Sequence, residues 1–146
     1  MNFKKLTGII IVTLLIGILP SLFIDMGIDT LNKPALYPPA IIFPIVWTIL
    51  YVLMSISVFM ATKKENEPYT IYLLQLIVSS AWPIIFFSLN FRLIGSILII
   101  ILIGLVITMM YKFFKQNKVS ALLLIPYLLW LFFAAYLSFA IYILNR

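Results

Sequence analysis

The sequence contains no cysteine and no histidine, and charged residues make up only 10% of its 146 residues. Without cysteine there can be no disulfides, no thiol redox chemistry and no cysteine nucleophile. Without histidine the chain lacks the commonest metal ligand, the usual general base and the usual haem anchor, so we expect no metal site. Soluble globular domains carry about 25% charged residues, so these shortages together argue against a soluble enzyme.

What the sequence has in abundance is apolar surface. Hydrophobic residues make up 65% of the chain, and the mean hydropathy is +1.22. A chain of this composition is expected to bury its apolar surface in a lipid bilayer. The net charge of +6 does not indicate a nucleic-acid partner, because the basic residues lie between apolar blocks, as in the cytoplasmic loops of membrane proteins.

Five apolar stretches are each long enough to cross a bilayer, which takes roughly 20 residues. They cover about residues 6–24, 40–62, 69–91, 93–111 and 119–145. The first resembles a signal peptide but has no small-residue cleavage site, so we interpret it as an uncleaved helix. The sequence therefore predicts an all-α membrane protein, a five-transmembrane-helix bundle forming a single domain over residues 1–146.

None of the five stretches contains Asp, Glu, Lys or Arg. Proton- and ion-coupled transporters usually need an ionisable group inside the membrane, and such residues are the default markers of function there. The sequence shows neither a ring of charged residues nor a carbonyl-filter loop, the features that would indicate an ion channel. The remaining interpretations are a helical bundle that holds a largely apolar ligand and a bundle that is purely structural.

Three of the stretches carry aromatic and polar residues at helical spacing. The stripes are Phe43, Trp47 and Tyr51; Gln75, Ser79, Trp82 and Phe86; and Tyr127, Trp130, Ala134 and Ser138. Most such stripes in membrane proteins pack in the core or form interfacial belts. However, Trp47, Trp130 and Gln75 lie deep in their spans, where their polar groups need partners. A shared pocket for a flat, mostly apolar ligand would supply them.

Proline lies beside each stripe, at positions 44, 83 and 126. Because proline has no backbone N–H and its ring crowds the preceding turn, we expect each to bend or loosen its helix.

The stripes and the residues around them resemble those of the translocator protein (TspO) family. The resemblance is carried by Lys33-Pro34, Pro38-Pro39, Phe43, Trp47, Leu50, Tyr51, Gln75-Leu76, Trp82, Phe86-Phe87, Leu124, Pro126-Tyr127, Trp130, Phe133-Ala134, Leu137 and Asn145. These motifs occur in the family's order across most of the chain. Ser79 and Ser138 stand where the family usually has asparagine.

The resemblance implies a five-helix bundle, often a homodimer, whose pocket is closed by the first loop. Family members bind porphyrins, and some bind sterols or benzodiazepine-type ligands. The resemblance also adds Pro38 of the first loop to the predicted pocket residues, besides those of the three stripes. We therefore expect a porphyrin as ligand, no required cofactor and the lipid bilayer as environment.

Three functions remain open, in this order. The first is a membrane receptor or carrier that binds a tetrapyrrole such as protoporphyrin. The second is a light-dependent enzyme that degrades porphyrin, in which Trp47 and Trp130 are the catalytic candidates. The third is a structural or regulatory membrane protein with a vestigial pocket.

The distribution of basic residues predicts the orientation. Five spans would place the amino terminus and the second and fourth loops on one side, with seven Lys and Arg residues against three on the other. The two sets are Lys4, Lys5, Lys63, Lys64, Lys112, Lys115 and Lys118, and Lys33, Arg92 and Arg146. The excess favours a cytoplasmic amino terminus and an external carboxyl terminus, with the cell membrane as the expected location.

Proteolysis of right-side-out vesicles tests this orientation. We expect cleavage in the loop at 25–39 and none at 63–68, because only the first loop would face outward. Protease added after detergent should cut both loops, and the reverse pattern in intact vesicles would overturn the topology.

Overall fold

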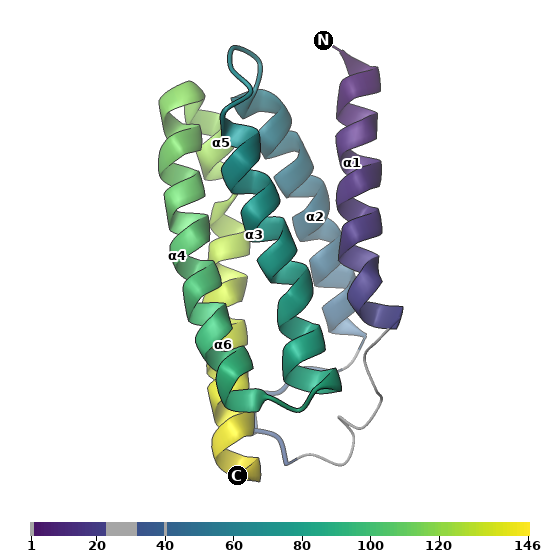
Figure 1. The fold of residues 1–146 in the computed structure, drawn as a ribbon, viewed down its shortest axis with the longest axis vertical. Coiled ribbons are helices and arrows are strands. Elements are labelled where there is room, and N and C mark those ends of the chain that lie inside the picture. The colour runs from purple at the N-terminus through teal and green to yellow at the C-terminus, as the bar shows by residue number, and fades with distance from the viewer. Residues whose placement is uncertain (1, 23–31, 40) are drawn as a thin grey trace.

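The computed structural model describes residues 2–22, 32–39 and 41–146, and every regular element in these ranges is helical. The helices run side by side along one long axis (Figure 1). In chain order they are α1 (Phe3–Ile18), η1 (Leu19–Leu22), α2 (Ile42–Ala61), α3 (Pro68–Pro83), η3 (Ile84–Ser88), α4 (Arg92–Gln116), α5 (Lys118–Leu122) and α6 (Ile125–Asn145).

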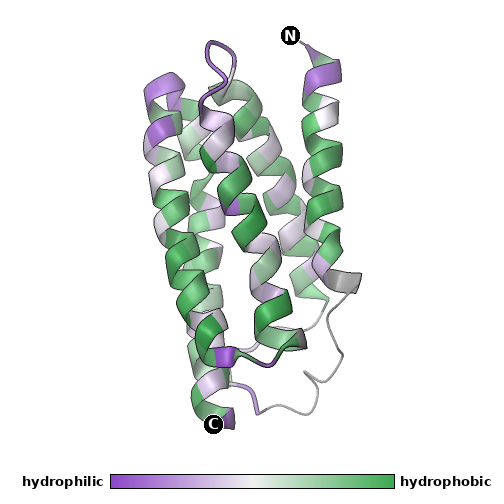
Figure 2. Ribbon diagram, viewed as in Figure 1, coloured by the Kyte–Doolittle hydropathy of each residue, from purple (hydrophilic) through white to green (hydrophobic). Residues whose placement is uncertain are grey.

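Four helical segments of the described chain are long and apolar enough to cross a membrane. They are Ile42–Ala61, Pro68–Phe87, Arg92–Gln116 and Lys118–Asn145. Large apolar side chains point outward along them, and Ile77 and Leu129 are 61% and 62% exposed. Figure 2 shows hydrophobic residues over most of the length of these helices, with the strongly hydrophilic residues mainly at the ends of the bundle. The chain is therefore an integral membrane protein.

The predicted first span is represented by the 16 residues of α1 and the four of η1, so five transmembrane helices are not confirmed. Its last two residues, 23 and 24, lie outside the described residues, as does residue 40 at the start of the second span. Asn2 caps α1 by accepting a hydrogen bond from the backbone N–H of Lys5 at 3.2 Å.

Helix α4 is longer than the predicted span of 93–111, because it continues to Gln116. Charged residues end a hydrophobic run, yet lysine is a good helix former, so the helix extends beyond the apolar stretch. The extension lets Lys112 form an ion pair with Glu67 at the start of α3, with 2.8 Å between Nζ and Oε1.

The three prolines act differently. Pro83 cannot donate to the carbonyl of Ser79, and the chain continues as the π-helix η3. Pro126 lies in the first turn of α6, just after a break that separates α5 from α6. Pro44 also lies in the first turn of its helix, where its missing N–H is of no consequence, and α2 runs unbroken from Ile42 to Ala61.

A tight turn joins η3 to α4. Asn90 adopts the left-handed conformation with φ of 59°, which asparagine tolerates better than most residues. Immediately after the turn, Gly95 of α4 lies against Phe86 of η3. A Cβ atom at Gly95 would be 2.9 Å from Cβ of Phe86 and 3.1 Å from its Cα, so the absent side chain permits this close approach.

Helix α4 packs against α3 and α6, whereas α1 packs against α2 and α3. The short helix α5 is fastened to α2 by two buried serines. Ser57 Oγ donates to the carbonyl of Ser120, and Ser120 Oγ donates to the carbonyl of Ser57, each at 2.7 Å. The amino terminus and the α2–α3 and α4–α5 connections lie at one end of the bundle, and the carboxyl terminus lies at the other (Figure 1).

Two glycines of α4 offer a matched test of the α3–α4 packing. We expect Gly95→Ala to lower the free energy of unfolding in detergent by about 1–3 kcal/mol, because the added methyl group collides with Phe86, including its backbone. Gly104→Ala should be neutral or stabilising by up to about 1 kcal/mol, since a Cβ there meets nothing within 4 Å. Equal effects of the two substitutions would contradict the close approach.

Candidate functional site

Aromatic side chains of α2 and α6 face one another. The ring centroids of Phe43 and Trp130 are 5.9 Å apart, and those of Trp47 and Tyr127 are 6.1 Å apart. Trp47 also contacts Tyr51, one turn along α2, at 5.5 Å. The predicted stripes on these two helices therefore come together, and we call these five residues the aromatic site.

A buried polar network adjoins the aromatic site. Tyr127 donates its phenolic O–H to Gln75 Oε1 at 2.9 Å, which joins α6 to α3. Gln75 Nε2 donates to the backbone carbonyl of Tyr72 at 3.1 Å, and the Tyr72 hydroxyl is hydrogen-bonded to Thr13 Oγ1 of α1. Gln75 and Thr13 are fully buried. The side-chain amide of Gln75, which we expected to need partners within the membrane, is therefore hydrogen-bonded through both its oxygen and its nitrogen.

Three buried donors at the predicted site have no partner. Among the described residues, the buried side-chain nitrogen and oxygen atoms without a hydrogen bond are Ser79 Oγ, Trp82 Nε1, Arg92 Nε and Trp130 Nε1. The first, second and fourth belong to the predicted stripes. Ser79 Oγ lies beside the phenol groups of Tyr51 and Tyr127 without forming a hydrogen bond of ordinary geometry. Each unpaired donor is costly to bury, so each marks a place where an acceptor would stabilise the protein.

The described part of the first loop, residues 32–39, extends the aromatic site. Tyr37 contacts Phe43 with 5.4 Å between ring centroids, and Lys33 Nζ lies 5.4 Å from the Tyr37 ring centroid. The loop is also attached to the end of α6. Asn145 accepts a hydrogen bond from the backbone N–H of Asn32 at 2.9 Å and donates one to its carbonyl at 2.8 Å.

Other predicted site residues are not joined to this cluster by ring contacts or hydrogen bonds. Trp82 contacts Phe86 and Phe87 instead, and Phe86 packs against α4. Ala134 and Ser138 are buried on α6, and Pro38 is half-buried in the loop.

Tyr37, Tyr72 and Thr13 are not among the site residues predicted from the sequence. Tyr72 could have been found, because it lies three residues before Gln75 and so continues the same stripe by one turn. Thr13 carries no such signal, since a lone threonine in an apolar run can bond to its own helix. Tyr37 lies outside the predicted spans, and its contact with Phe43 depends on the path of the loop.

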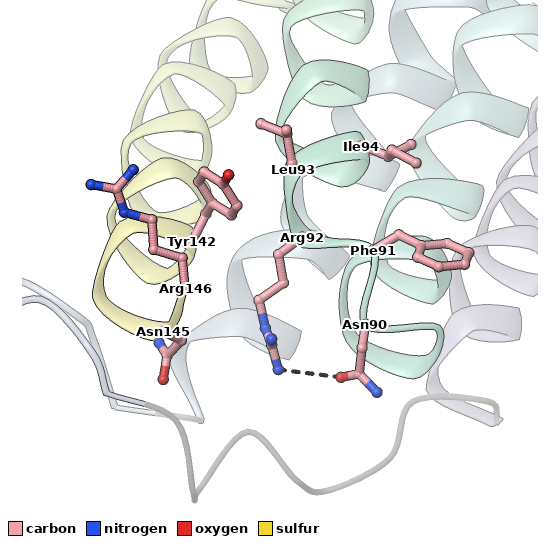
Figure 3. A pocket seen from close by; sticks show the side chains of 8 residues that line it. All are labelled: Asn90, Phe91, Arg92, Leu93, Ile94, Tyr142, Asn145 and Arg146. Atoms are coloured by element: carbon pink, nitrogen blue, oxygen red, sulfur yellow. Dashed lines mark hydrogen bonds between the residues drawn. The ribbon is translucent and has the colours of Figure 1, made fainter.

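An open pocket of about 360 Å³ lies between the start of α4 and the end of α6, and no residue of the aromatic site lines it (Figure 3).

The described residues contain no group of three or more His, Cys, Asp or Glu side chains that could hold a metal ion. The aromatic site offers aromatic rings for stacking and the Nε1–H of Trp130 as a hydrogen-bond donor, with the Ser79 hydroxyl beside Tyr51 and Tyr127.

The hydrogen bond between Tyr127 and Gln75 can be tested by removing one hydroxyl. We expect Tyr127→Phe to lower the free energy of unfolding in detergent by about 1 kcal/mol, because Gln75 Oε1 is left unpaired in the interior. Tyr111→Phe is the matched control, since that side chain is 63% exposed and its loss should change little.

Pairing Tyr127→Phe with Gln75→Leu completes a double-mutant cycle. If the bond is real, the double substitution should cost less than the sum of the single ones, because neither partner is then left unsatisfied. Strict additivity would show that the two side chains do not interact.

Comparison with known proteins covers almost the whole chain. The model of the TspO/MBR family matches residues 9–144. The tryptophan-rich protein TspO of Archaeoglobus fulgidus is 36% identical over 154 residues, covering 99% of each chain. Protein CrtK of Rhodobacter capsulatus is 36% identical over 124 residues, covering 80% of this chain and 77% of its own. The human translocator protein is 31% identical over 121 residues, covering 77% of this chain and 70% of its own. The aromatic site and the polar network lie within the matched residues, and the chain belongs to the TspO/MBR family.

Proposed function

We propose that this membrane protein binds a tetrapyrrole such as protoporphyrin at the aromatic site, and that it acts as a receptor or carrier for that ligand. Relatives named tryptophan-rich sensory protein and translocator protein are consistent with a sensory or carrier role. The observation that carries the proposal is the buried, unpaired Nε1–H donor of Trp130 within the aromatic site.

Ser79, Trp82 and Trp130 account for three of the four such atoms in the described chain. Trp130 belongs to the aromatic site, whereas Trp82 contacts Phe86 and Phe87 apart from it. Unpaired buried donors are rare in folded proteins, so the Trp130 donor is a reason to expect a ligand with acceptor atoms at the aromatic site. Ordinary packing would explain the aromatic contacts, but it would not explain why Trp130 Nε1 is left without an acceptor.

The shape and polarity of the site favour a flat ligand. Trp47, Tyr127 and Trp130 offer ring faces and edges, on which an extended π-system stacks. The rings contact one another, so a macrocycle enters by separating α2 side chains from α6 side chains. Since the chain has no His or Cys, we expect metal-free porphyrin to bind at least as tightly as haem.

We further propose that α1 and η1 together form a fifth membrane span. Sixteen α-helical residues at 1.5 Å each and four 3₁₀ residues at about 2 Å each give about 32 Å, close to the hydrocarbon thickness of about 30 Å. With five spans the basic end of the bundle is cytoplasmic, and the first loop and carboxyl terminus are external, in the cell membrane.

A dark titration of protoporphyrin into the detergent-purified protein tests the binding site. Following the porphyrin absorbance, we expect saturable binding of one ligand per chain. Trp130→Leu should raise the dissociation constant by about tenfold, because it removes both a stacking surface and an unpaired donor.

Phe132→Leu is the matched control, since Phe132 is on the same helix, is 51% exposed and points toward lipid. It should bind porphyrin like the unmodified protein. Linear, unsaturable absorbance changes that are the same in all three proteins would mean that porphyrin only partitions into the micelle, and would overturn the proposal. Much tighter binding of haem would contradict the expectation for the metal-free ligand.

A further inference from the structure

The pocket between the start of α4 and the end of α6 has a composition unlike that of the aromatic site. It has a volume of about 360 Å³ and is open to the surroundings. Arg92 and Arg146 supply two positive charges, and Tyr142, one turn before Arg146 on α6, supplies an aromatic side chain (Figure 3). None of these residues belongs to the proposed tetrapyrrole site.

Arg92 is the central residue of this pocket. Its Nε atom is buried and has no hydrogen-bond partner, while Nη2 donates to Asn90 Oδ1 at 3.3 Å. Figure 3 shows the Arg92 and Asn90 side chains extending to the same side of the chain. The guanidinium of an arginine that lines a pocket is suited to an oxyanion, because its planar fork matches carboxylate and phosphate oxygens.

Acidic side chains of the described residues do not compensate this charge. Those side chains, Glu65 and Glu67, lie in the α2–α3 connection, and Glu67 is paired with Lys112. That connection is at the opposite end of the bundle from Arg92 (Figure 1). Arg146 adds positive charge at the rim of the pocket, although its side chain extends away from Arg92 in Figure 3.

The position of the pocket indicates where the anion comes from. Arg92 is the only charged residue between Pro68 and Lys112, and it lies at the first residue of a membrane-spanning helix, where headgroups are expected. The other side chains of the pocket include Phe91, Leu93 and Ile94, which are 53%, 44% and 57% exposed. Exposed apolar walls beside a cation suit a molecule with a charged head and hydrocarbon chains.

We propose that this pocket binds the phosphate group of an anionic membrane lipid, with Arg92 as the principal ligand and the lipid chains along the apolar residues of α4. A free phosphate ion would satisfy the arginine but would leave the apolar walls uncovered. The site shares no residue with the proposed tetrapyrrole site, so either proposal can fail without the other.

Native mass spectrometry of the full chain, purified in a neutral detergent, tests the site with dioleoylphosphatidylglycerol as the probe. We expect Arg92→Gln to raise the dissociation constant of the tightest lipid by about tenfold, because a charge-assisted hydrogen bond is lost. Lys64→Gln removes the same charge from the exposed α2–α3 connection at the other end, and it should change that constant by less than about twofold. Equal effects would show only general attraction to a positive protein and would overturn the site.

Two further measurements separate the lipid from other sources of the same chemistry. Dioleoylglycerol, which has the same chains without phosphate, should bind weakly and equally to all variants, and tight binding would overturn the role of phosphate. Inorganic phosphate in large excess should not displace the lipid, and displacement would assign the pocket to a free anion.

If Arg92→Gln does not fold, Arg92→Lys tests the role of the arginine instead, because lysine keeps the positive charge but lacks the Nε donor and the planar guanidinium. We expect it to bind the lipid more weakly than the native chain, and unchanged binding would contradict the proposal.

Discussion

Hydrocarbon offers no hydrogen-bond partner, and most features of this protein follow from that constraint. The helices satisfy their own backbone groups, and several hydroxyl side chains bond back to their own helix, as Ser55 does to the carbonyl of Tyr51 at 2.8 Å and Thr108 to that of Gly104 at 2.9 Å. Gln75 has no such local solution for its oxygen and is paired with Tyr127 across two helices. The donors left unpaired therefore stand out, because the other buried polar side chains of the described residues have hydrogen-bond partners.

Side-chain volume decides where the site can lie. At Gly95 the absence of a side chain brings α4 against Phe86, which leaves no room for a ligand between these elements. Between α2 and α6, in contrast, large rings fill the interface and separate the backbones. Gly17 of α1 contributes indirectly, because a Cβ there would lie 2.8 Å from Cδ2 of Tyr51. Helix α1 can thus press against the Tyr51 ring, which in turn packs on Trp47.

The two ends of the bundle differ in chemistry. One end carries the amino terminus and exposed lysines, including Lys112 in its ion pair with Glu67. The described residues at the other end include three charged ones, Lys33, Arg92 and Arg146. There the described part of the first loop is attached through Asn32 to Asn145. Residues 32–39 of this loop are held at one point by paired amide hydrogen bonds and at another by the contact of Tyr37 with Phe43, which places Tyr37 next to the aromatic site. The same end contains the Arg92 pocket, so the structure combines a stacking site inside the bundle with a cationic site at its edge.

The sequence by itself determined the helical class, the membrane location, the family and the residues of the aromatic stripes. These follow from local properties, namely long apolar runs and residues repeated at helical spacing, which survive whatever the helices pack against. It did not determine that Tyr37 contacts Phe43, that Thr13 pairs with Tyr72, or that Phe86 turns toward α4. Nor did it reveal the pocket at Arg92. Those features join residues far apart in the chain, and only the tertiary structure decided them, because the order of the helices and the path of the loops determine which faces meet.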